Sequence, residues 1–105
     1  VTGHLGDNAS VEDGYEQAKI CAINLIAQVK AACYGDLDRV VRVVKLGGFV
    51  ASTPDFTQQP AVVNGASDLM VAAFGDAGKH ARFAVGSSVL PLGCLVEVDG
   101  VFEIS

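Results

Sequence analysis

The sequence predicts an α+β fold in which two helices cover one face of a small sheet. Two segments carry apolar residues at intervals of three and four, and three others are rich in β-branched or alternating apolar residues. They occur in the order helix, strand, helix, strand, strand, which is typical of helices gathered on one sheet face. Three strands are few for two long helices, so we expect a partner chain to supply more sheet, or the sheet to be incomplete at its N-terminal side.

The chain is long enough for one domain and apolar enough to fold. It has 105 residues, of which 50% are hydrophobic and 18% are charged. A chain of this length forms a single core, and this composition excludes intrinsic disorder. We therefore expect residues 1–105 to form a single domain.

The first helix is predicted from about Val11 to Ala32 or Cys33, after a loop formed by residues 1–10. Ser10 is the expected N-cap, because serine accepts a hydrogen bond from the first turn and Glu12 and Asp13 suit the positive end of the helix dipole. Gly35 marks the expected end of the helix. The apolar stripe consists of Tyr15, Ala18, Ala22, Leu25, Ile26, Val29 and Ala32.

The first strand begins at Val40, after a short polar turn at Asp36–Asp38. The run from Val40 to Leu46 is almost continuously apolar and β-branched, which indicates an interior strand. Gly47 and Gly48 interrupt it before Phe49, and they predict either a bulge or a close backbone approach.

The second helix follows the Thr53–Asp55 turn, with Pro60 in its first turn and Gly75 at its end. Gly65 is unfavourable inside this helix by about 1 kcal/mol relative to alanine. The helical spacing is carried by Val62, Val63, Ala66, Leu69, Met70, Ala73 and Phe74.

Two strands are expected near the C-terminus, over Ala81–Val89 and Leu95–Ile104, joined by a loop at Leu90–Gly93. In the last strand, apolar residues alternate with acidic ones, although Gly100 disturbs the alternation. We expect one face of this strand to be buried and the other to be polar. The apolar members are Val96, Val98, Val101 and Ile104.

Charge and hydropathy exclude two classes of partner. The net charge is −5 and the seven lysines and arginines are scattered, whereas binding to nucleic acid needs a clustered basic face. No window approaches the roughly 20 apolar residues of a membrane span. The chain starts at Val1 without the basic and apolar regions of a signal peptide. We therefore expect neither nucleic acid nor membrane as a partner.

The cysteines and histidines give no sign of a metal or a cofactor. Cys21, Cys33 and Cys94 are an odd number without metal-ligand spacing, and they predict free thiols in a cytoplasmic protein. His4 and His80 are too few and too far apart for a metal cluster. We expect no metal site and no cofactor.

Arg82 and Glu97 are the candidate site residues. Arg82 opens a strand of small and apolar residues, where a guanidinium needs an anionic partner and favours a carboxylate. That partner is either a ligand or an acidic residue of the next strand, Glu97 or Asp99. Glu97 lies in an apolar strand, where a buried carboxylate serves as acid or base, whereas an outward carboxylate is only solvated.

The spacing around these residues resembles that of the Rid family of enamine and imine deaminases, also called the YjgF family. Arg82 is followed eight residues later by Leu90-Pro91 and fifteen residues later by Glu97, as in the family pattern. The segment Asp36–Val40 before the valine-rich strand and the segment Phe56–Asn64 at the start of the second helix also match. The resemblance extends from about Ser10 to Ile104. It is closest to a branch marked by His80-Ala81-Arg82 and Leu90–Gly93.

The resemblance implies a chorismate-mutase-like fold, assembled as a homotrimer with clefts between subunits. In such proteins the arginine at the position of Arg82 binds the carboxylate of a 2-imino or 2-enamino acid. Water adds to the imine carbon and ammonia leaves, which gives a 2-keto acid. The glutamate at the position of Glu97 orients that water or its polar neighbours. Such a reaction needs mainly positioning and proton handling.

The sequence departs from the family pattern in two places. The family opens with a strand hairpin that carries a site tyrosine and a Ser-Gly-Gln-like segment, and we find no counterpart of it in these residues. Ala84 stands where many members have a cysteine. The sequence therefore leaves two functions open: hydrolytic deamination, or a non-catalytic trimeric module of the same fold that binds small molecules or proteins.

Overall fold

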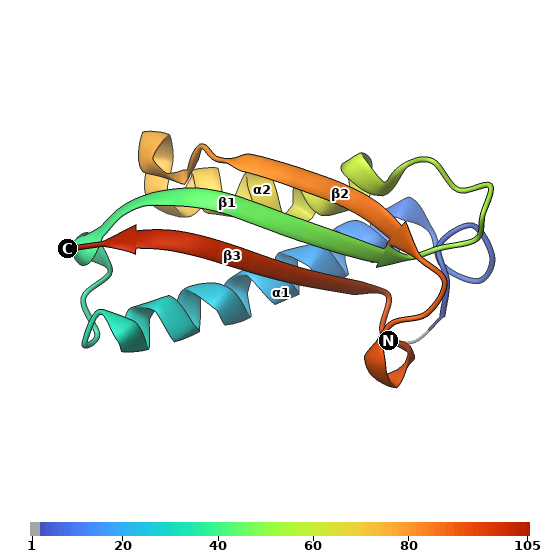
Figure 1. Ribbon diagram of the computed structural model, residues 1–105, viewed down its shortest axis with the longest axis horizontal. Coiled ribbons are helices and arrows are strands. Elements are labelled where there is room, and N and C mark those ends of the chain that lie inside the picture. Colours follow the sequence, from blue (N-terminus) through green and yellow to red (C-terminus); the bar gives the residue numbers. More distant parts are fainter. Residues whose placement is uncertain (1–2) are drawn as a thin grey trace.

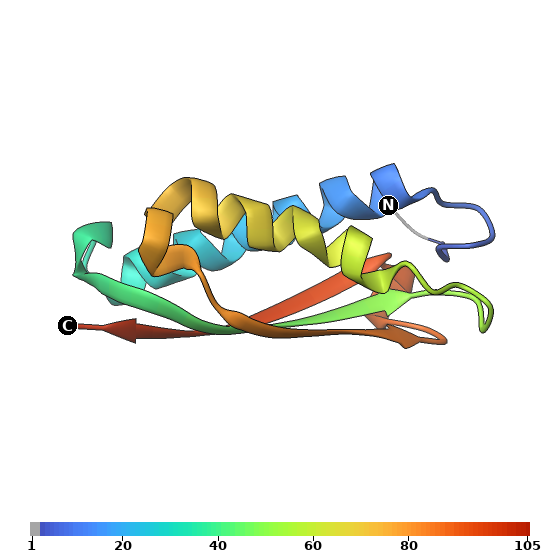
Figure 2. The same ribbon diagram turned by 90° about the horizontal axis from the view of Figure 1, so that it is seen from above.

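The computed structural model describes residues 3–105, and it confirms the predicted α+β fold. Both helices lie on one face of the sheet, and the other face is open (Figures 1 and 2). The expected loop at residues 1–10 is seen from residue 3 onward, and Val1 and Thr2 lie outside the described residues. The elements are α1 Val11–Ala32, β1 Val40–Ala51, α2 Gln59–Phe74, β2 Ala81–Ser87 and β3 Val96–Ile104, with short 3-10 helices η1 Leu37–Arg39, η2 Gly75–Gly78 and η3 Pro91–Gly93.

The sheet has the strand order β2-β1-β3 (Figure 1). β1 runs parallel to β2 and antiparallel to β3, so the prediction of an interior first strand is confirmed. The last two strands are shorter than predicted: β2 ends at Ser87 and β3 begins at Val96. The chain between them turns through η3, where Leu92 and Gly93 have positive φ angles of 58° and 69°, which an extended strand excludes.

The core lies between the helices and the inner face of the sheet. Gly65, which the sequence left without a reason, makes this packing possible: a Cβ there would meet the backbone carbonyl oxygen of Tyr15 and lie 3.0 Å from its carbonyl carbon. The two helices therefore cross at backbone contact. The buried cluster consists of Leu5, Ala18, Ala22, Val43, Leu46, Val50, Val62, Val63, Ala66, Met70, Leu95 and Val96.

Gly47 and Gly48 mark a close approach, and the alternative of a bulge at this point is wrong. The register shifts of β1 against β3 fall earlier, between Val40 and Arg42 and between Val43 and Lys45. A Cβ on Gly48 would lie 2.5 Å from Cγ2 of Val63. Glycine is needed here because α2 packs directly on the β1 backbone.

Ser10 caps α1 as predicted. Its hydroxyl accepts a hydrogen bond from the Asp13 amide at 3.1 Å, and the Asp13 carboxylate accepts one from the Ser10 amide at 3.1 Å. This reciprocal pair is a capping box, so two of the free amide groups at the helix start are satisfied.

The Ser10→Ala substitution should lower the free energy of unfolding by about 1 kcal/mol, because one of these amides loses its acceptor. Urea denaturation followed by circular dichroism measures the change. Ser10→Thr keeps the hydroxyl and is the matched control, for which we expect a much smaller loss. Equal stability of Ser10→Ala and the wild type would contradict the role of the cap.

The open face of the sheet is less polar than the sequence predicted. Glu97 and Asp99 are exposed there, as expected for the polar side of β3. Val101, which was expected on the buried side, shares their face and is 55% exposed, because the alternation of β3 continues through Gly100. Phe49 and Phe83 also meet on this face, with their ring centroids 5.4 Å apart. The open face is therefore mixed apolar and acidic.

The three cysteines are free, as predicted. Cys33 is buried at the C-cap of α1 and does not belong to the helix itself. Burial raises the pKa of the Cys21 thiol, with smaller contributions from Cys94 and Glu97. Across the helix pair, the Tyr15 hydroxyl donates to the Asp68 carboxylate at 2.9 Å, and this hydrogen bond raises the pKa of Tyr15. Within residues 3–105, no helix combines the length and the apolar character needed to cross a membrane.

Candidate functional site

Arg82 points from β2 to the helix side of the sheet. Its guanidinium donates to the Ser67 hydroxyl at 3.1 Å and to the Pro60 carbonyl oxygen at 3.3 Å, both on α2. Ala84, two residues further along β2, packs against the core on the same side. The two bonds engage only neutral acceptors and leave most of the five guanidinium donors free.

The alternative that Arg82 pairs with Glu97 or Asp99 is wrong within one chain. β1 lies between β2 and β3, and in the part of the chain from residue 3 onward no carboxylate is within ion-pair distance of Arg82. Glu97 is also on the other side of the sheet, because its neighbours Val96 and Val98 pack into the core. The two predicted site residues are therefore not brought together in one protomer.

Arg82 lines an open cavity of about 310 Å³ on the surface. Its volume lies near the lower end of ligand pockets, which suits a small molecule. Two lining side chains besides Arg82 are basic, Lys79 and His80, and none is acidic. Lys79 is exposed and pairs with Asp76 at 3.1 Å, outside the lining. The complete lining is Asn64, Ser67, Val71, Lys79, His80 and Arg82.

Ser67 and His80 form a hydrogen-bonded pair beside Arg82. Ser67 Oγ is 2.9 Å from His80 Nε2, and His80 Nδ1 is 2.6 Å from the carbonyl oxygen of Gly78. All three side chains are half-buried. In the sequence, His80 was weighed as a metal ligand and formed part of the His80-Ala81-Arg82 marker, and Ser67 was not singled out. No pattern could have joined them, because Ser67 lies in the middle of α2 and His80 lies 13 residues later.

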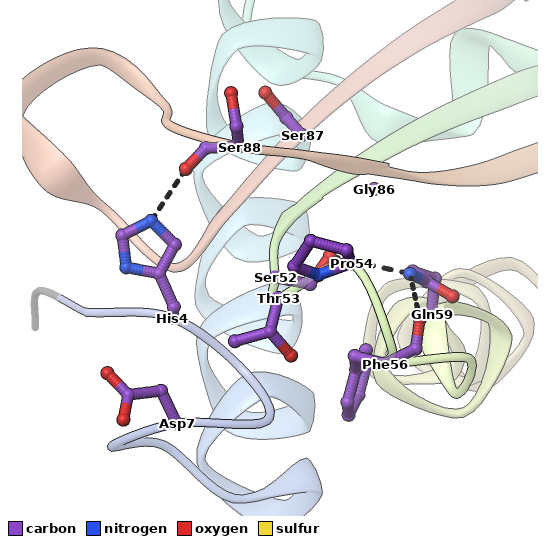
Figure 3. A pocket seen from close by; sticks show the side chains of 10 residues that line it. All are labelled: His4, Asp7, Ser52, Thr53, Pro54, Phe56, Gln59, Gly86, Ser87 and Ser88. Carbon is purple, nitrogen blue, oxygen red and sulfur yellow. Dashed lines mark hydrogen bonds between the residues drawn. The ribbon is translucent and has the colours of Figure 1, made fainter.

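A second cavity, of about 520 Å³, lies where β1 and β2 end beside the start of α2 (Figure 3). His4 lines this cavity, and its Nε2 donates to the Ser88 carbonyl oxygen at 2.6 Å. Gln59, which also lines the cavity, donates to the Phe56 carbonyl oxygen at 2.9 Å. Asp55 lies in the loop between β1 and α2, and the hydrogen bond from the Thr53 hydroxyl lowers the pKa of its carboxyl group. The lining is His4, Asp7, Ser52, Thr53, Pro54, Phe56, Gln59, Gly86, Ser87 and Ser88.

The smaller cavity suits a carboxylate better than the larger one. The larger cavity has Asp7 in its lining and contains no lysine or arginine. The smaller cavity has Arg82 and Lys79 and no acidic group. Because an arginine fork binds a carboxylate through two parallel hydrogen bonds, Arg82 is the natural anchor for an anion. Neither cavity contains a metal centre, since residues 3–105 bring no three histidine, cysteine or acidic side chains together.

Two helices cover one face of an open mixed sheet, and a cavity at the edge strand is lined by an arginine and no acidic residue. The chain belongs to the family described as "YjgF/chorismate mutase-like, putative endoribonuclease", whose model matches residues 1–104. The resemblance seen in the sequence is therefore confirmed at the level of the family and its fold.

Three relatives show how closely the chain follows this family. It is 51% identical to Protein TCP17 of Trypanosoma cruzi over its whole length, and it spans 66% of that protein. It matches the crystal structure of Atu1372 from Agrobacterium tumefaciens with a TM-score of 0.98 and 48% identity, covering 100% of this chain and 67% of the other. For a protein from Shewanella oneidensis MR-1 described as a "putative endoribonuclease", the TM-score is 0.88 and the identity 36%, covering 92% and 64%.

Proposed function

We propose that this protein hydrolyses reactive 2-imino and 2-enamino acids to 2-keto acids and ammonia, with Arg82 binding the substrate carboxylate. The observation that supports this most directly is the state of Arg82. Its guanidinium touches only the neutral oxygens of Ser67 and Pro60 and faces a cavity without acidic lining. A half-buried arginine without a carboxylate partner is suited to receive one from a ligand.

The proposed reaction requires little beyond positioning. The oxygen of water bonds to the electrophilic imine carbon, which gives a carbinolamine, and the carbon–nitrogen bond then breaks. Both protons of the water end on nitrogen, so that ammonia leaves and a keto group remains. Fixing the carboxylate on Arg82 holds the imine carbon at a constant distance from the cavity wall, and such positioning contributes much of the rate enhancement in reactions of this kind.

We also propose a homotrimer in which the site is completed between subunits. Within one chain, Glu97 is on the open face and Arg82 is on the helix side of the edge strand. Glu97 can therefore reach only the Arg82 cavity of a different protomer. There it would orient the attacking water. The exposed apolar residues of the open face favour burial against a second copy. These include Val85 and Val101, which are 43% and 55% exposed.

The activity is tested by adding the protein to freshly generated 2-aminoacrylate and following pyruvate formation. We expect pyruvate to form faster than in buffer alone. The competing function is a non-catalytic binding module: if 2-keto acids bind saturably while the imine decays at the buffer rate, deamination is wrong and the binding module is correct. RNA cleavage that depends on Arg82 would instead favour the nuclease named in the family description, which a net charge of −5 does not support.

The assembly is tested by mixing two inactive variants. Arg82→Ala and Glu97→Gln chains, unfolded together and refolded in equal amounts, should regain about a quarter of the wild-type activity, because one site in four combines both intact residues if the two come from neighbouring subunits. Each variant refolded alone is the control and should stay inactive. Mixed trimers without activity would contradict a site shared between subunits.

A further inference from the structure

We infer that His80, acting with the Ser67 hydroxyl, is the acid–base group of the Arg82 cavity. This role rests on the proposed deamination, in which His80 and Ser67 would transfer the protons between water and the substrate nitrogen. Both side chains line the cavity together with Arg82, so they border the space where a bound imine would lie. Glu97 cannot serve this role within one chain, because it lies across β1 and on the other face of the sheet.

The hydrogen bonds fix where the protons are. The Gly78 carbonyl oxygen can only accept, so His80 Nδ1 carries a proton and donates it at 2.6 Å. In the neutral imidazole, Nε2 is then an acceptor, and the Ser67 hydroxyl donates to it at 2.9 Å. Ser67 Oγ in turn accepts from the Arg82 guanidinium at 3.1 Å. The result is a base, a hydroxyl and a fixed cation in sequence, which is the arrangement that activates a hydroxyl or a water molecule.

The location of these residues favours a chemical role over a purely local one. A serine inside a helix commonly donates to a carbonyl oxygen of the preceding turn. The hydroxyl of Ser67 instead bonds to Arg82 on β2 and to His80, which lies just before β2. His80 is held by the η2 turn, where a Cβ on Gly78 would meet the Met70 carbonyl oxygen, so the turn is packed tightly against α2. The carbonyl oxygen that accepts from the imidazole therefore belongs to a turn packed tightly on α2.

The pair can carry both proton transfers of the reaction. When the water oxygen bonds to the imine carbon, the water gives a proton to Ser67 Oγ, and Ser67 passes its own proton to His80 Nε2. The proton held by the imidazolium then goes to the substrate nitrogen, which forms the carbinolamine. The carbinolamine hydroxyl loses its proton by the same route while the carbon–nitrogen bond breaks, and the proton returns to the departing ammonia. No oxidant, metal or further reactant is needed.

The charged groups that face His80 are the Arg82 guanidinium from β2 and the Lys79 ammonium beside it, with the neutral Asn64 and Ser67 on α2. Asp76 of η2 pairs with Lys79 at 3.1 Å and does not line the cavity.

The test compares kcat for 2-iminopropanoate between pH 5 and 9 in the wild type and in His80→Gln, which keeps a donor but cannot act as a base. We expect His80→Gln to lower kcat by a factor of about 10² to 10³ with little change in KM, and to change the pH profile of kcat. Ser67→Ala should lower kcat, whereas Ser67→Thr should retain most of it. His4→Gln, in the other cavity, is the matched control and should leave both kcat and its pH dependence unchanged.

Three results would overturn the inference. A His80→Gln variant that keeps the wild-type kcat and pH profile, in a protein whose turnover depends on Arg82, would exclude His80 and leave the deaminase proposal intact. A wild type without turnover would exclude the deaminase and the pair together. Independently of activity, ¹⁵N NMR of the imidazole should show a protonated Nδ1 and an unprotonated Nε2, and the reverse tautomer would exclude Nε2 as the base.

Discussion

The Gly65→Ala substitution should lower the free energy of unfolding by about 3 kcal/mol, at the upper end of what one added methyl group causes in a packed interior. The new Cβ would collide with the carbonyl oxygen of Tyr15 and lie 3.0 Å from its carbonyl carbon. Backbone atoms cannot rotate out of the way as a side chain can. The helices must therefore separate, even though alanine is the better helix former by about 1 kcal/mol.

Equilibrium denaturation in urea measures this loss. Gly14→Ala is the matched control, because Gly14 is also a buried helical glycine, but the nearest atom to its added Cβ is Cγ1 of Val62 at 2.8 Å. Since a valine side chain can yield more than a backbone carbonyl group can, we expect Gly14→Ala to cost about 1 kcal/mol, clearly less than Gly65→Ala. A Gly65→Ala protein as stable as the wild type would show that α1 and α2 do not cross at this contact.

The Arg82→Ala substitution should lower kcat/KM for 2-iminopropanoate by a factor of about 10² to 10³, because a charge-assisted, bidentate contact is lost in a partly desolvated cavity. Arg82→Lys keeps the charge but not the fork, so it should recover only part of the rate. The effect should be specific to carboxylate substrates, since the arginine recognises the carboxylate and not the imine.

Pyruvate formation measures the rate, and gel filtration checks that the assembly is unchanged. Arg42→Ala is the matched control. Arg42 is an exposed arginine that does not line the cavity, and its Nε lies 3.2 Å from the Glu103 carboxylate. We expect Arg42→Ala to retain full activity. An Arg82→Ala protein that turns over imines at the wild-type rate would exclude Arg82 as the carboxylate anchor.

Much of the fold could be predicted because its signals are local. The spacing of apolar residues located both helices, and Ser10 marked the start of α1 through the hydrogen bonds of its own turn. The strand ends were less certain: β2 stops at Ser87 because the following segment turns, and nothing in the side chains of Ser88 or Val89 announces that. The prediction for Val101 was wrong, since its exposure depends on the register of β3 and not on its own hydrophobicity.

The candidate site was predictable only in part. Arg82 could be found because a cation at the start of an apolar strand is unusual, and its spacing to Glu97 pointed to the family. Whether the two residues meet within one chain was left open by the sequence, and the strand order separates them by β1. The Ser67–His80 pair had no signal, because a helical serine and a histidine after a turn are each ordinary until α2 and β2 pack together.

The sequence by itself determined most of the secondary structure and the choice of interior strand, and it singled out Arg82 as the candidate site arginine. These follow from periodicity, β-branched content and charge, which act within a few residues of chain. Only the tertiary structure decided why Gly65 is required, on which face Glu97 lies and which groups surround Arg82. Contacts between residues distant in the chain are set by strand order and helix packing, and the insertion of β1 between β2 and β3 is enough to keep Arg82 and Glu97 apart within one chain.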